Sequence, residues 1–380
     1  MSNTAKNHYV PRGYLKFFFG AENSIYRLDK TTGDIREFIG IKSVERLAME
    51  KDLYTVTTPI SEKDIIFYKR MFDIPELTKA HEDILNIIVK FMNNDLLSIF
   101  PKFTLKNKVD GTRNEEAQKI IDDYLTKTFA HIGPARMQED LCTLHEKQFY
   151  KVRNEIIQQK NLDCIYPIGD KFKDPIFFKC IQLYSYIWQG LIKDAYAELV
   201  AKYGIPTPPL DPIPNAPYFD LFYYVIFQYF RCPYFFNTFQ NDDKAMILKT
   251  KHGTDIKNVQ FLFLQHKTLD LLSKWHFDGM KPILIINNTK TPFITSDRPS
   301  INIYGKLIDP QSLMHIQGAF ELFFPLSNEI ALLYSERSCY KDINVLTETD
   351  ESKIEIWNKT IFDNADRWVF ASQNNFYDLI

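Results

Sequence analysis

The chain lacks the segments and motifs that mark the commonest membrane, nucleotide-binding and hydrolase proteins. No window reaches about 18 uncharged apolar residues, the length that spans a bilayer. The most apolar stretch, 218–239, is interrupted by polar residues that include Asp220 and Arg231. The first seven residues, MSNTAKN, form a polar segment without an apolar run, so we expect no secretory signal. P-loop, GxGxxG and GxSxG motifs are absent. These absences predict a cytoplasmic protein without a membrane partner.

An excess of one charge and a cysteine framework are also missing. The chain has 46 basic and 48 acidic residues, a net charge of −2, which argues against a wide sequence-independent DNA footprint. A balanced net charge is still compatible with a local basic patch. The five cysteines show no CxxC spacing, which fits reduced thiols in the cytosol better than disulfides or a zinc site. The histidines show no ligand spacing either, so we expect no metal site and no cofactor, with a divalent metal left open.

Apolar and aromatic residues are abundant. Hydrophobic residues make up 45% of the 380 positions, with 31 Phe and 21 Tyr, so the chain can bury a large aromatic core. Turn residues bound apolar runs near both ends of the chain, which predicts strands at 14–19, 24–29, 34–39, 259–264, 282–287, 293–296, 319–324, 330–334 and 367–371. Helical periodicity predicts helices at 135–159, 175–202, 218–230 and 351–365, with a proline-rich connector at 206–214.

This order of elements predicts an α+β fold. We expect a mixed sheet built from N- and C-terminal strands, with a large central helical insert. The expected parts are N-terminal strands at 1–60, the helical insert at 61–245 and the completing strands at 246–380. No low-complexity linker divides them, so we expect one compact unit. The oligomeric state cannot be derived from the sequence.

The octapeptide at 8–15 is the most informative motif. It groups His8, Arg12 and Tyr14 around Pro11, which fixes its own φ and favours an extended conformation at Val10. An imidazole beside a guanidinium is a common way to handle an anion such as a phosphate. The structural alternative is a His8 that caps a strand and an Arg12 that pairs with a surface carboxylate.

Two further segments place polar side chains next to apolar runs. Gln228 and Arg231 are three residues apart, so they share a helix face in the most apolar part of the chain. A charge buried there needs a carboxylate, a phosphate ligand or helix-terminal carbonyls. Ser296 and Asp297 follow the apolar run at 293–295, which indicates either a donor and an acid at a strand end or a turn that satisfies the loop backbone.

A fourth segment, 139–146, carries Glu139, His145 and Glu146 in a predicted helix. A His–Glu pair indicates a metal only with a third ligand, and HExxH spacing is absent. We interpret the segment as a solvated helix face.

Four motifs together resemble domain-of-unknown-function family 4238. The motifs are HxxPRxYL at 8–15, QxxRxP at 228–233, FITSDRP at 293–299 and FPLS at 324–327. The family's usual Arg-Thr-Pro is Arg231-Cys232-Pro233 in this chain. The resemblance implies a prokaryote-like intracellular protein and supplies no catalytic assignment. It does imply that the motif residues gather in one pocket.

Such a pocket predicts phosphodiester chemistry. His8 and Asp297 would be the catalytic pair, and Arg12, Tyr14, Gln228, Arg231 and Ser296 would bind the substrate without a metal. The predicted protein is a nuclease or phosphodiesterase that acts on RNA or nucleotides, as a toxin or defence effector. A non-catalytic sensor or interaction module that binds an anion or a nucleotide is the first alternative. A buried polar network with a purely structural role is the second.

Overall fold

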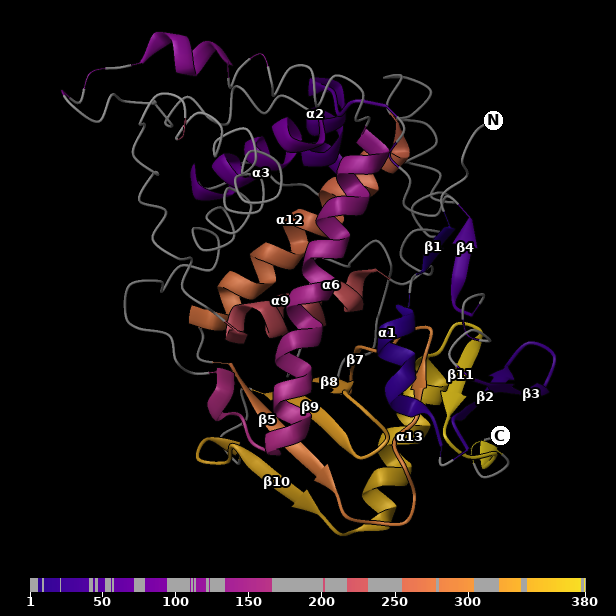
Figure 1. The fold of residues 1–380 in the computed structure, drawn as a ribbon. Helices are drawn as coiled ribbons and strands as arrows, with labels where there is room; N and C mark the ends of the chain where they lie inside the picture. The colour runs from indigo at the N-terminus through magenta and orange to yellow at the C-terminus, as the bar shows by residue number, and fades with distance from the viewer. Residues whose placement is uncertain are drawn as a thin grey trace.

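The structure is a computed structural model that describes residues 6–8, 10–20, 22–40, 44, 47–51, 56, 58–71, 79–93, 110, 112, 114–120, 123, 134–165, 201, 217–231, 255–277, 280–303, 321–335, 340–376 and 379. These residues form an α+β fold, as the sequence predicts. In Figure 1 the long helices occupy the upper part of the molecule and the larger sheets the lower part.

One antiparallel sheet joins the two ends of the chain. Its strand order is β3-β2-β11-β6, and its strands are β2 (Ser24–Asp29), β3 (Asp34–Ile39), β6 (Thr295–Ser296) and β11 (Trp368–Ala371). Strand β11 lies between β2 and β6, with Trp368 opposite Asp29 and Val369 opposite Ser296. The predicted sharing of a sheet by N- and C-terminal strands is therefore confirmed.

A second, mixed sheet is formed by later strands alone. Its order is β10-β5-β9-β8-β7, and its strands are β5 (Lys281–Asn287), β7 (Ile301–Asn302), β8 (Glu321–Pro325), β9 (Ile330–Ser335) and β10 (Val345–Glu348). Only the β10–β5 pair is parallel. A separate antiparallel pair contains β1 (Lys6–His8) and β4 (Met49–Lys51).

The helices vary in length from a single turn to 26 residues. They are α1 (Arg12–Leu15), α2 (Glu62–Met71), α3 (Lys79–Met92), α6 (Pro134–Gln159), α9 (Pro217–Phe230), α12 (Ile256–Phe277) and α13 (Glu351–Asn364), with short 3₁₀ helices η1 (Lys16–Phe18) and η3 (Asp163–Ile165). Every residue of α9 is buried, because this helix packs against both α6 and α12.

The second sheet separates two hydrophobic layers. Side chains alternate between the faces of a strand, and the face that carries Leu332 and Tyr334 joins the core around α9. The ring of Tyr334 stacks on that of Phe222 with their centroids 4.2 Å apart. The opposite face, which carries Leu333, packs with Ile354 and Ile361 of α13. The helices α6 and α9 thus cover one face of this sheet and α13 the other.

Two predicted strands are wrong. The run at 259–264 lies within α12, where 258–266 are all buried. A continuous apolar run of this length does not distinguish a buried helix from a buried strand. The run at 14–19 forms α1 and η1 because Pro11 starts a helix there, with its carbonyl accepting from the backbone N–H groups of Tyr14 and Leu15 at 3.0 and 3.2 Å.

Two other predictions fall outside the described residues. These are the helix at 175–202, of which only residue 201 is described, and the connector at 206–214. The domain boundaries stay predictions. In the described ranges, no helix combines the length and the apolar character needed to cross a membrane.

The residue directly after helix α6 has a left-handed backbone conformation although it is not a glycine. Lys160 follows the helix with φ of 51°, and its backbone N–H donates to the Ile156 carbonyl at 2.8 Å. Glycine is the usual residue at this position because a Cβ atom is strained there.

We therefore expect Lys160→Gly to raise the free energy of unfolding by about 0.5–1 kcal/mol. Urea denaturation measures the difference. Lys160→Ala is the matched control, because it removes the ammonium group but retains the Cβ atom. A glycine variant no more stable than the alanine variant would contradict the prediction.

Candidate functional site

The predicted N-terminal motif forms the start of α1. Pro11 is the N-cap residue, with φ of −63° and ψ of 140°. Arg12 is exposed at the first position of the helix, whereas Tyr14 is buried. The His8 backbone lies in β1 opposite Met49, and its side chain lies outside the described part of the structure. The motif thus places Arg12 and Tyr14 on different sides of one helical turn.

Tyr14 connects α1 to both larger sheets through hydrogen bonds. Its hydroxyl donates to the Pro325 carbonyl at 2.7 Å and forms a hydrogen bond with Thr295 Oγ1 at 2.9 Å. Burial raises the pKa of Tyr14 far above its usual value, so the phenol stays protonated. These contacts favour a structural role for Tyr14 over the predicted role in substrate binding.

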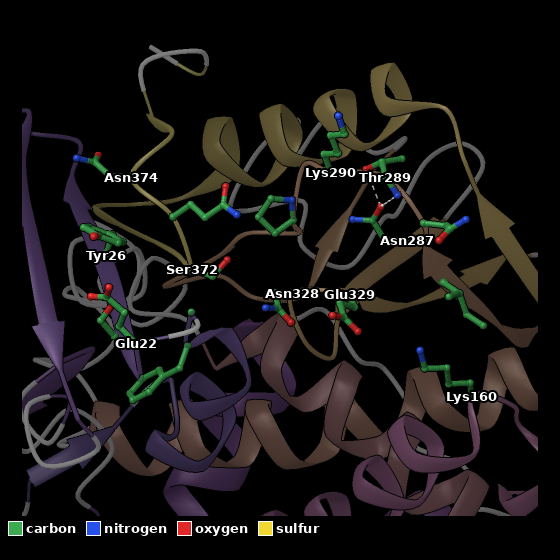
Figure 2. A pocket seen from close by; sticks show the side chains of 17 residues that line it. Glu22, Tyr26, Lys160, Asn287, Thr289, Lys290, Asn328, Glu329, Ser372 and Asn374 are labelled. Carbon is green, nitrogen blue, oxygen red and sulfur yellow. Dashed lines mark hydrogen bonds between the residues drawn. The ribbon is translucent and has the colours of Figure 1, made fainter.

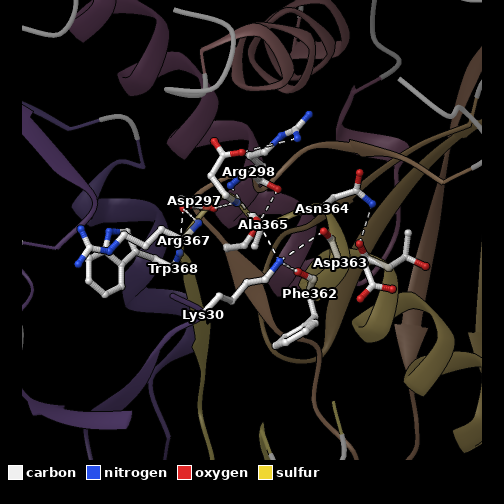
Figure 3. A network of polar contacts seen from close by, with 12 residues as sticks. Lys30, Asp297, Arg298, Phe362, Asp363, Asn364, Ala365, Arg367 and Trp368 are labelled. Carbon is white, nitrogen blue, oxygen red and sulfur yellow. Dashed lines mark hydrogen bonds and ion pairs between the residues drawn. The ribbon is translucent and has the colours of Figure 1, made fainter. Parts of the chain in front are cut away.

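Asp297 satisfies the backbone at the junction between α13 and β11 (Figure 3). Its carboxylate accepts from the N–H groups of Asp366, Arg367 and Trp368 at 2.9, 2.7 and 2.8 Å. Desolvation, followed by the charge of Asp366, raises the pKa of Asp297 to about 6. The neighbouring Ser296 hydroxyl accepts from the Arg298 N–H at 3.1 Å and donates to its carbonyl at 3.0 Å. Both side chains thus support the structural alternative, a turn that satisfies its own backbone.

Charged residues of the N-terminal hairpin complete this junction. Lys30 Nζ donates to the carbonyls of Phe362 and Ala365, near the end of α13, at 2.6 and 2.7 Å (Figure 3). A cation is favoured at that end of a helix. Arg367 Nη2 lies 2.8 Å from Asp29 Oδ2. The junction at 365–368 therefore ties the first β-hairpin to the last helix and strand.

The other predicted residues lie where α6 packs against α9. Helix α6 contributes three residues at spacings i, i+4 and i+7, which places them on one helix face. Helix α9 and the residue that follows it contribute three at the same spacings. We call this set the α6–α9 polar cluster: Glu146, Tyr150 and Arg153 from α6, Tyr224 and Gln228 from α9, and Arg231 directly after α9. Ring stacking fixes the packing of the two helices, since the centroids of Phe149 and Tyr224 are 3.8 Å apart.

Arg231 has the carboxylate partner that its burial requires. Its Nη1 lies 3.1 Å from Glu146 Oε1, with 6% of the Arg231 side chain and 27% of the Glu146 side chain exposed. The interpretation of 139–146 as a solvated helix face is wrong for its last residues. His145 is buried against the ring of Tyr223, and Glu146 turns toward Arg231.

Arg153 is a buried cation without such a partner. Only 1% of the residue is exposed. Its Nη2 donates to the Gly13 carbonyl at 3.0 Å, whereas Nε and Nη1 have no hydrogen-bond partner among the described residues. The guanidinium lies over the ring of Phe17 at 3.5 Å. Desolvation lowers the pKa of Arg153 to about 10, so the group keeps its charge at neutral pH.

The remaining members are neutral hydrogen-bonding groups. Both amide atoms of Gln228 are buried without a hydrogen-bond partner among the described residues. The hydroxyls of Tyr150 and Tyr224 influence each other's pKa but form no hydrogen bond of normal geometry. Burial raises the pKa of both phenols well above their usual values, so both remain donors.

Gly13 permits the close approach of α1 to this cluster. A Cβ atom at residue 13 would lie only 2.7–2.9 Å from ring and hydroxyl atoms of Tyr150. The absence of a side chain lets the Gly13 carbonyl reach Arg153 while Tyr150 packs beside it. Helix α1 therefore contacts the cluster through Gly13 and the sheets through Tyr14.

The comparisons with known proteins concern the second half of the chain. The family model described as "Protein of unknown function (DUF4238)" matches residues 209–375. Residues 209–375 are therefore similar to that family. The predicted resemblance is thereby confirmed over these residues, which include the motifs at 228–233, 293–299 and 324–327. The octapeptide and the α6 half of the polar cluster lie outside the matched residues. No curated protein and no solved structure matches the chain.

The structure groups the predicted residues only in part. Arg231 and Gln228 belong to the polar cluster, which α1 contacts through Gly13. Asp297 instead binds the α13–β11 junction, and its side-chain hydrogen bonds are all with that junction. The residues that sequence reasoning missed are Arg153, Tyr150 and Tyr224. Their i, i+4, i+7 spacing with Glu146, Gln228 and Arg231 is the signal that could have found them.

Acidic, histidine and cysteine side chains do not form a candidate metal site in the described ranges. There, no three such side chains come together as they would around a metal ion.

Asp297 makes the stability of the fold depend on pH. Its pKa is raised from 3.8 to about 6 in the folded chain, so between these values the folded state binds more protons than the unfolded state. Stability should therefore fall as pH rises from about 4 to about 6.

Urea denaturation across this range measures the effect. Asp297→Asn has no ionisable group at the site and should lose this component, whereas the control Asp34→Asn, with a side chain that is 42% exposed, should retain it. An unchanged pH profile for Asp297→Asn would show that another group causes the dependence.

Proposed function

We propose that the protein binds a small oxyanion of the phosphate class at the α6–α9 polar cluster. The ligand is a free phosphate or the phosphate group of a nucleotide. The observation that carries the proposal is Arg153, which is buried, has two nitrogen atoms without a hydrogen-bond partner and forms no ion pair, both among the described residues. A buried charge without a counter-ion is costly, and an anion would remove that cost.

The charges of the cluster support the same ligand. Arg153 and Arg231 contribute two positive charges, and Glu146 contributes one negative charge. The phenols of Tyr150 and Tyr224 stay neutral because burial raises their pKa. The sum leaves one positive charge for a ligand to neutralise.

The donors fit the geometry of an oxyanion. A guanidinium presents a planar fork of N–H groups that binds two oxygen atoms of a phosphate at once. The phenols and the Gln228 amide are further donors without a hydrogen-bond partner among the described residues. Glu146 and Tyr150 are the partly exposed members of the cluster, so we infer that the ligand enters on their side. This function is the sensor or binding alternative of the sequence analysis, in the cytoplasm that the composition predicts.

The same excess of positive charge favours a second candidate function. Cleavage of a phosphodiester in RNA or a nucleotide, as by a toxin or defence effector, needs donors that stabilise developing negative charge. The two arginines of the cluster meet that need. His8 would be the general acid or base, and its catalytic role stays a prediction, as does that of Asp297.

Isothermal titration calorimetry with inorganic phosphate, AMP and a short RNA tests the binding proposal. We expect saturable binding by the wild-type protein and a loss of at least about tenfold in affinity for Arg153→Gln. Arg153→Lys should retain part of the affinity. Arg36→Gln is the matched control, because the Arg36 side chain is 64% exposed and lies outside the cluster.

Thermal unfolding with and without phosphate distinguishes a variant that has lost the binding site from one that is only less stable. Phosphate should raise the Tm of the wild type but not that of Arg153→Gln. Equal affinities for these two proteins, or no saturable binding by the wild type, would contradict the proposal. Incubation with labelled RNA tests the second candidate function. Cleavage of the RNA that His8→Ala abolishes would establish catalysis. Binding of the RNA without cleavage would establish a sensor.

A further inference from the structure

A second site lies away from the polar cluster, at the ends of the two larger sheets. It is an open pocket of about 800 Å³ (Figure 2). Its lining comes from within 19–26, 286–292, 328–329 and 372–374 and from Lys160. The pocket has the volume of a typical small-molecule site, and four separate parts of the chain together with the end of α6 build it.

The charges around this pocket are balanced. Lys160 and Lys290 contribute two positive charges, and Glu22 and Glu329 contribute two negative charges (Figure 2). A site for nucleic acid or phosphate carries an excess of Lys and Arg. The lining therefore favours a ligand without net charge.

Side-chain amides dominate the neutral part of the lining. Four of them form no hydrogen bond with another described residue, and these are Asn288, Asn328, Gln373 and Asn374. A fifth, Asn287, is used within its own loop, where it donates to the Thr291 carbonyl and accepts from Thr289. Each free amide offers two donors and one acceptor, a combination that matches neighbouring hydroxyl groups.

Two strands contribute lining residues, β2 through Ser24 and Tyr26 and β5 through Ile286 and Asn287. Both strands lie inside their sheets, so side chains are the main groups available for recognition. The half-buried rings of Phe19 and Tyr26 add apolar surface at one end.

We propose that this pocket binds a short neutral oligosaccharide. Hydroxyl groups supply the donors and acceptors that the free amides need, and the aromatic rings pack against the apolar face of a sugar. The site is independent of the proposed anion site.

A glycan array that carries neutral and acidic oligosaccharides, followed by calorimetry with the best neutral ligand, tests this proposal. We expect binding of neutral glycans and a loss of at least about tenfold in affinity for the double variant Gln373→Ala/Asn374→Ala. Both side chains are exposed and form no hydrogen bond with another described residue, so the double variant should fold normally. Gln158→Ala is the matched control, because Gln158 is exposed on α6 outside the pocket.

Arg153→Gln separates this proposal from the anion site, since it should leave glycan affinity unchanged. No saturable binding of any neutral glycan would overturn the proposal. A preference for acidic glycans, or equal affinity in the double variant and the wild type, would overturn it as well.

Discussion

The buried guanidinium of Arg153 is the constraint around which the helical layer is organised. It lies between α6 and α1, over the ring of Phe17, and its hydrogen bond to the Gly13 carbonyl connects the two helices. The neighbouring Arg231 is neutralised by Glu146. Hydrogen bonding to one carbonyl and contact with aromatic rings only partly offset the desolvation of a full charge. This incomplete compensation is the basis of the proposed anion site.

The two polar networks of the molecule differ in how many of their buried polar groups have hydrogen-bond partners. The Asp297 carboxylate accepts three backbone N–H groups, and the end of α13 receives Lys30. That network holds the last helix and strand to the first hairpin, and its members have partners within the protein. In the α6–α9 polar cluster, donors of Arg153 and Gln228 have no hydrogen-bond partner within the part of the chain that the structure describes. A satisfied network stabilises a fold, whereas unused donors at a buried charge indicate a ligand.

Local patterns predicted the elements whose faces differ in polarity or whose ends carry clear signals. The hairpin of β2 and β3, the long helix α6 and the C-terminal pair of α13 and β11 are confirmed. Residues 259–264 of helix α12 were predicted to form a strand, because a fully buried apolar run shows no helical periodicity. The need of Arg231 for a counter-charge could be predicted, but Glu146 could not, because helix packing alone brings these residues together. The pocket at the ends of the two larger sheets is built from separate parts of the chain, and nothing local in the sequence indicates their convergence.

Guanidinium-selective ¹⁵N NMR of the protein titrated with inorganic phosphate tests the anion site most directly. We expect the Nε–H resonance of Arg153 to shift and to saturate with the affinity that calorimetry gives, while the resonance of the exposed Arg36 does not shift. An Arg153 resonance that stays unchanged at saturating phosphate would show that the cluster does not bind the anion.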